Sequence, residues 1–145
     1  MDSPLLAKSK QFALDIIKVC NKVKSEKRES VLTNQLIRSG TSIGANIREA
    51  FYGHGKNDFI AKLQIALKEC SESEYWIELL IESGYYDDNT ILRNCVELKK
   101  ILISSINTVK KKINECIIIV RLFQRKELML TPQPDKAVLV LKPYF

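Results

Sequence analysis

The sequence has little glycine, one histidine and no long apolar run, and each shortage argues against a class of protein. Only five of the 145 residues are glycine and 46% are hydrophobic, so extensive disorder is not expected. Apolar runs are short, as at residues 117–120, whereas a membrane span needs about 20 apolar residues. No basic region followed by an apolar one opens the chain, so we expect no signal peptide. These features predict one soluble, cytoplasmic domain with no membrane contact.

Histidine and cysteine are too few and too scattered for a metal centre or a redox motif. His54 is the one histidine, and it follows Gly53 in a stretch that reads as a loop. The four cysteines lie far apart, without metal-finger or redox spacing. Each falls in or beside an apolar helical pattern, so we expect reduced thiols that act as small core residues. They are Cys20, Cys70, Cys95 and Cys116.

The sequence contains no recognisable catalytic constellation. The stretch 53–56 is too short for a phosphate-binding glycine loop, and it follows a helix rather than a strand. A di-iron bundle would use Glu-x-x-His pairs, which one histidine cannot supply. We therefore expect a protein that is not an enzyme, with no cofactor, no metal and no small-molecule substrate.

Hydrophobic spacing predicts four helices, at about residues 3–25, 29–51, 57–83 and 90–125. Ser3 and Pro4 suit the start of the first helix, and Gly84 suits the end of the third. Short connections favour an all-α, up-down-up-down antiparallel four-helix bundle over residues 1–115. Residues 116–145 are then an extension of the fourth helix and an irregular or extended tail, because Pro132 and Pro134 break any helix. Residues 137–141 read as a short strand.

The second predicted helix contains an unusual stretch at residues 35–50. Gly40 and Gly44 are four residues apart and fall on one face, although an interior glycine costs about 1 kcal/mol relative to alanine. We interpret the pair as a point of close helix approach, either within one bundle or between subunits. Arg38 and Glu49 lie eleven residues apart and hence along one line of the same helix.

Acidic residues in the third predicted helix, Glu69 among them, offer partners to Arg38, so we expect an ion pair within or between subunits. A phosphate contact is the alternative for Arg38. Asn46, beside the apolar line, is expected to hydrogen bond to a neighbouring helix. Trp76, next to Tyr75, is interpreted as a packing or interface residue, with base stacking as the alternative.

The stretch 35–50 and the residues after it carry a family resemblance. They resemble the four-helix-bundle proteins encoded in 23S rRNA intervening sequences, also called the S23 ribosomal protein family. A more distant similarity is to the accessory variability protein of diversity-generating retroelements, a homopentameric basic bundle that binds nucleic acid. The resemblance implies a non-enzymatic bundle, a homo-oligomer (a pentamer by that analogy), and RNA or DNA as a partner. The residues that carry it are Gln35–Leu36, Arg38, Ser39–Ile47, Glu49–Ala50, Phe59, Lys62–Leu63, Ile65–Ala66, Lys68–Glu69, Glu72 and Glu74–Trp76.

Charge is unevenly distributed along the chain. Residues 1–56 hold ten basic and five acidic residues, residues 57–97 three and nine, and residues 98–145 ten and three. One hypothesis is therefore that lysines of the first and fourth helices neutralise nucleic-acid phosphates. The alternative is a protein-interaction scaffold without nucleic-acid binding, whose basic residues form a solvated surface. The candidate lysines are Lys18, Lys22, Lys24, Lys99, Lys100, Lys110, Lys111 and Lys112.

Overall fold

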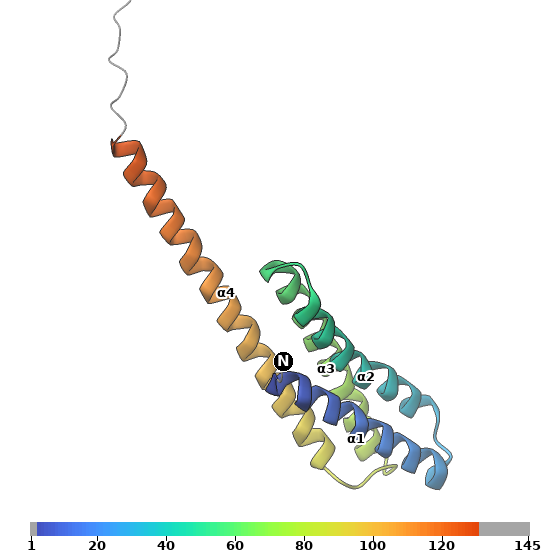
Figure 1. Ribbon diagram of the computed structural model, residues 1–145. Helices are drawn as coiled ribbons and strands as arrows, with labels where there is room; N and C mark the ends of the chain where they lie inside the picture. Colours follow the sequence, from blue (N-terminus) through green and yellow to red (C-terminus); the bar gives the residue numbers. More distant parts are fainter. Residues whose placement is uncertain (1–2, 131–145) are drawn as a thin grey trace, which may run out of the picture. The chain divides into compact units, whose positions relative to one another are not determined.

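The computed structural model describes residues 3–130, and the side chains of residues 3–125. These residues form four α-helices, which confirms the all-α prediction: α1 (Pro4–Lys27), α2 (Val31–Tyr52), α3 (Lys56–Glu82) and α4 (Thr90–Leu130) (Figure 1). The chain divides into two units, residues 1–111 and 112–145, and each is described by itself.

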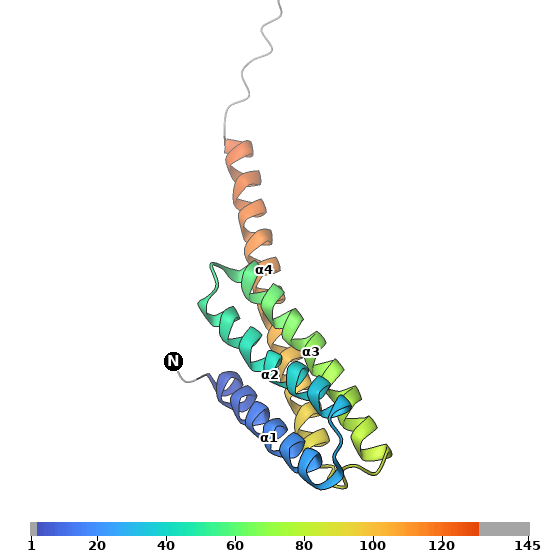
Figure 2. The same ribbon diagram turned by 90° about the vertical axis from the view of Figure 1, so that its right-hand side faces the viewer.

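In the first unit the helices lie side by side with alternating direction, the predicted up-down-up-down bundle (Figure 2). α1 packs on α2, and α2 packs on α3. The buried Cys70 of α3 lies against Cys95 of α4, with 3.7 Å between their sulfur atoms. Lys8 of α1 forms an ion pair with Glu97 of α4. Each helix therefore has two neighbours in the bundle.

The helix boundaries differ from the predicted ones by a few residues. α1 continues past Ser25 to Lys27, and it ends where Arg28 adopts a left-handed conformation (φ 54°) and donates its N–H to the carbonyl of Lys24. α4 continues five residues past the predicted Arg125, to Leu130. The strand predicted at residues 137–141 lies outside the described residues.

All four helices contribute to one hydrophobic core. Three of the four cysteines are buried in it, as predicted, and burial raises the pKa of Cys20 to about 12, so this thiol stays neutral. The prediction was wrong for Cys116, which is exposed, because its apolar neighbours in residues 117–123 are exposed as well. The most completely buried large side chains are Ile16, Val23, Leu36, Ile43, Ile47, Leu63, Ile77, Leu80, Leu98 and Leu102.

Gly40 and Gly44 both face α1 of the same chain. An ideal Cβ at Gly40 would lie 3.0 Å from Cγ1 and from Cγ2 of the fully buried Ile16. At Gly44 the nearest atom would be the backbone oxygen of Ser9, at 3.5 Å, which is an ordinary contact distance. The glycines thus permit close packing within the bundle, the first of the two interpretations above.

Replacing each glycine by alanine should affect the melting temperature differently: Gly40→Ala should lower it, and Gly44→Ala should not. Gly40→Ala should destabilise the bundle by about 1 kcal/mol, because overpacking against Ile16 outweighs the gain in helix propensity. Gly44→Ala should leave stability unchanged or raise it by up to about 1 kcal/mol. Thermal unfolding measures both variants, and a shift of the same sign in both would contradict this account.

Glu29 caps the N-terminus of α2 with its side chain. Its carboxylate oxygens accept hydrogen bonds from the backbone N–H groups of Leu32 (2.7 Å) and Thr33 (3.0 Å). Burial alone would raise the pKa of this carboxyl, but these hydrogen bonds outweigh burial and lower the pKa below its usual 4.5. Because the ionised form is favoured in the folded chain, its contribution to stability is present above pH 4.5 and lost as the pH falls through the lowered pKa.

Glu29→Gln should therefore destabilise the bundle in a pH-dependent way. At pH 7 we expect a loss of about 1 kcal/mol, the usual effect of removing a helix cap. The difference from the wild type should narrow as the pH falls below 4.5, since the wild-type carboxylate is then protonated as well. Denaturant unfolding at a series of pH values measures it. A difference that stays constant across the series would show that the charge has no part in the cap.

Candidate nucleic-acid interface

The line from Arg38 to Glu49 on α2 faces α3. Arg38 forms an ion pair with Glu72, and its second guanidinium nitrogen lies 3.8 Å from Glu69. At the other end, the Lys62 ammonium lies 2.6 Å from Glu49. Arg38 therefore pairs with α3 carboxylates within its own chain. Glu69 is one-fifth exposed and has a side-chain oxygen without a hydrogen bond, so Arg38 supplies its nearby positive charge.

Asn46 and Trp76 also make contacts within the chain. The Asn46 amide donates to the carbonyl and the hydroxyl of Ser42, at 2.9 and 3.1 Å, so the predicted bond to a neighbouring helix is wrong. The carbonyl one turn earlier in the same helix is within reach of this short side chain. The Trp76 indole N–H donates to Glu72 at 3.2 Å, beside the ring of Tyr75. This bond joins Trp76 to the α2–α3 ion pairs, a packing role.

Removing Arg38 should destabilise the bundle in a way that depends on Glu69. Arg38→Met leaves the Glu69 carboxylate without its nearby cation, so we expect a loss of about 1 kcal/mol. In a Glu69→Gln background the same substitution should cost less, because the partly buried Glu69 charge is no longer there to lose its cation. A double-mutant cycle by thermal unfolding measures the coupling. An unchanged melting temperature in Arg38→Met would refute the structural role.

The candidate lysines of α1 and the start of α4 are mostly engaged with neighbouring groups. The Lys18 ammonium lies 3.8 Å from a carboxylate oxygen of Asp15. The Lys22 ammonium lies 6.0 Å from the ring centroid of Tyr86. Lys24 donates to Asn34 at 2.7 Å. Lys99 forms an ion pair with Glu74 of α3, and this hydrogen bond raises the pKa of Lys99. These four lysines therefore do not form one open basic face.

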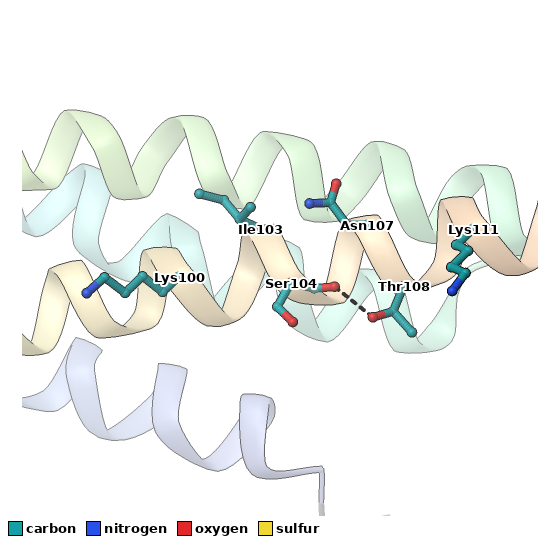
Figure 3. A pocket seen from close by; sticks show the side chains of 6 residues that line it. All are labelled: Lys100, Ile103, Ser104, Asn107, Thr108 and Lys111. Carbon is teal, nitrogen blue, oxygen red and sulfur yellow. Dashed lines mark hydrogen bonds between the residues drawn. The ribbon is translucent and has the colours of Figure 1, made fainter.

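The remaining candidates follow one another along α4. Lys100 and Lys111 stand at the two ends of a shallow strip on one face of the helix (Figure 3). Eleven residues separate them, which is about 16 Å along the axis. Ser104, Asn107 and Thr108 lie between them, and the Thr108 hydroxyl donates to the carbonyl of Ser104 at 2.9 Å. We call residues 100, 103, 104, 107, 108 and 111 the α4 strip.

The α4 strip has the chemistry of a phosphate-contacting surface. Both of its lysines are exposed, and neither has an acidic partner among the described side chains. Hydroxyl and amide side chains between cations are typical donors to phosphate and sugar oxygens. Sequence reasoning found the lysines but missed Ser104, Asn107 and Thr108, although their spacing of three and four residues from Lys100 and Lys111 was a usable signal. Lys110 is exposed beside the strip, and Lys112 belongs to the second unit.

A second basic surface lies between α1 and α2. A groove of about 580 Å³ there is lined by Lys10 and Arg48, with Ser3, Thr41 and Tyr52 among its polar side chains and Gly44 in its wall. No acidic residue is among those that line it. Sequence reasoning missed this groove because Lys10 and Arg48 are 38 residues apart in sequence, and they share a surface only after α1 has packed on α2.

Within residues 3–130, no helix is both long and apolar enough to cross a membrane. The same residues contain no group of three or more His, Cys, Asp or Glu side chains that could hold a metal ion.

Comparison with known proteins agrees with the fold and with the sequence resemblance. The model of the 23S rRNA-intervening sequence protein family matches residues 1–104. The chain belongs to this family. A crystal structure of a protein of unknown function from the S23 ribosomal protein family of Bacteroides thetaiotaomicron VPI-5482 is 46% identical, with a TM-score of 0.69. The similarity covers 70% of this chain and 97% of that one. No curated protein matches the chain.

Proposed function

We propose that this family member is a non-enzymatic homo-oligomer, a pentamer by the family analogy, that binds RNA or DNA through the α4 strip. The observation that carries the proposal is the pair of exposed lysines, Lys100 and Lys111, joined by polar side chains and free of acidic partners within the described part of the chain. Such a surface contacts phosphates and reads little of the base sequence.

Repetition of the strip would give it useful affinity. Two lysines neutralise about two phosphates, which supports weak binding by itself. In a homo-oligomer each subunit adds one strip, and one nucleic-acid chain that meets several strips binds far more tightly than a single contact allows. Self-association and nucleic-acid binding therefore support each other in this proposal.

The residues that carry the family resemblance on α2 and α3 are already engaged in contacts within the bundle, so nucleic acid would bind elsewhere on the chain. Arg38, Glu49, Glu69 and Trp76 are engaged between α2 and α3, and Gly40 lies against α1. This leaves the lysines of α4 as the better phosphate contacts. A protein-interaction scaffold is the second candidate function, and the exposed apolar side chains at residues 117–123 are the observation that favours it.

The test removes the two strip lysines and compares matched double variants. Lys100→Gln/Lys111→Gln should weaken binding to a labelled 20-nucleotide RNA and to a DNA duplex by about tenfold at low salt. The slope of log K against log salt should fall by about 1.5, because two phosphate contacts are lost. Lys27→Gln/Lys68→Gln removes the same charge from exposed positions on α1 and α3 and should retain wild-type binding.

A third double variant separates the two basic surfaces. Lys10→Gln/Arg48→Gln removes both cations of the α1–α2 groove. Lost binding in this variant, with binding retained in the strip variant, would overturn the assignment to α4. Wild-type protein that binds neither nucleic acid at low salt, or binds with no salt dependence, would overturn the nucleic-acid function and favour the scaffold.

A further inference from the structure

The groove between α1 and α2 has the size of a small-molecule site. Its volume is about 580 Å³, and pockets that hold small molecules measure roughly 300–1,000 Å³. The residues that line it come from the start of α1, at positions 3–13, and from the second half of α2, at positions 41–52. A molecule in this groove would therefore contact two helices of one subunit at once.

The packing of α1 on α2 orders the side chains along the groove. The two helices run in opposite directions, and the backbone oxygen of Ser9 lies 3.5 Å from the place that a Cβ at Gly44 would take. Lys10, next to Ser9, is thus at the level of Gly44. Arg48 follows one turn further along α2, about 6 Å away along the axis, and Tyr52 follows after another turn. The two cations therefore border the middle of the groove, and Tyr52 stands at its end.

The charged residues that line the groove are all basic. Lys10 and Arg48 are exposed, and neither has an acidic partner among the described side chains. The hydroxyl of Ser3 makes no capping hydrogen bond at the start of α1, so it is available as a donor. An anion in the groove would meet two cations and a hydroxyl, and hydrogen bonds between charged groups are stronger than those between neutral ones.

The rest of the groove is suited to a flat apolar group. Leu6 and Ala7 line it on the side of α1, and Gly44 and Ala45 line it on the side of α2. The ring of Tyr52 is 80% exposed, so its face is open to stacking by another ring. An inorganic anion would leave these carbon atoms exposed to water, whereas an aromatic ring that carries the anionic group would cover them.

We infer that the α1–α2 groove binds a small aromatic molecule that carries a phosphate or carboxylate group. The anionic group lies between Lys10 and Arg48, and the aromatic ring lies against the apolar lining and Tyr52. This site is separate from the α4 strip. The inference goes beyond the proposed function and depends neither on nucleic-acid binding nor on self-association.

Three naphthalene compounds test the chemistry of the site in the full chain at pH 7.5. They are 1-naphthyl phosphate, 1-naphthoate and the neutral 1-naphthol, and fluorescence anisotropy of the naphthalene ring measures their affinities. 1-Naphthyl phosphate should bind about tenfold more tightly than 1-naphthol, because only the anion pairs with the two cations. The ratio between the phosphate and the carboxylate compound identifies which anionic group the site prefers. Equal affinity for all three compounds would overturn the inference.

Two matched double variants test the role of the cations. Lys10→Gln/Arg48→Gln should weaken the binding of 1-naphthyl phosphate by about tenfold and leave that of 1-naphthol nearly unchanged. Lys27→Gln/Lys68→Gln removes the same charge from exposed positions outside the groove and should retain wild-type affinity. Circular dichroism should show the same helical content in all of the proteins.

A second pair of variants tests the position of the ring without changing charge. Ala45→Phe fills the groove and should weaken the binding of all three compounds, whereas Ala61→Phe makes the same change at an exposed position of α3 and should have no effect. Lys100→Gln/Lys111→Gln should also bind 1-naphthyl phosphate like the wild type, which separates the groove from the α4 strip.

Two results would overturn the assignment to the groove. One is a wild type that does not bind 1-naphthyl phosphate at millimolar concentration. The other is binding that neither Lys10→Gln/Arg48→Gln nor Ala45→Phe weakens, because the compound then lies elsewhere, for example on the exposed apolar side chains at residues 117–123. Neither result bears on the nucleic-acid proposal, which the variant of the α4 strip tests.

Discussion

The bundle depends on the close approach of α1 to α2 at Gly40. The side chain of Ile16 occupies the space next to this glycine, where a Cβ would lie only 3.0 Å from its methyl and methylene carbons. Ile16 is fully buried, and so is Ile43 of α2, so the contact lies inside the hydrophobic core. The same approach brings Lys10 and Arg48 to one groove, and it leaves α3 and α4 to complete the other side of the core.

The charged residues of α2 differ from those of α4 in their partners. Arg38 of α2 is paired with carboxylates of α3, whereas Lys100 and Lys111 of α4 are exposed and have no acidic partner among the described side chains. Between α2 and α3, Arg38 meets Glu69 and Glu72, and the buried hydroxyls of Ser39 and Ser73 lie 2.9 Å apart. A ligand that took Arg38 would leave the partly buried Glu69 carboxylate without its nearby cation, which costs stability. The exposed cations of α4 face no such penalty, and this difference places phosphate contacts on α4 in our proposal.

Much of the fold could be predicted from residue spacing, because helical periodicity is a local property of the chain. The apolar line through Leu36, Ile43 and Ile47 identified α2, and all three side chains are buried. Contacts between helices were harder to predict. Asn46 turned back to Ser42 of its own helix, and Lys99 paired with Glu74 of α3. Each choice depends on which groups a neighbouring helix brings within hydrogen-bonding distance, and spacing along one helix contains no such information.

The sequence by itself determined the helices, the bundle and the family, since these follow from periodicity and from an ordered string of residues. It also supplied the lysines of the α4 strip and the apolar positions after residue 111. Tertiary structure decided which lysines lack an acidic partner. A lysine is available to a phosphate only when folding has placed no carboxylate beside it. For Lys99 folding brought Glu74, and for Lys100 and Lys111 it brought no acidic partner within the described residues.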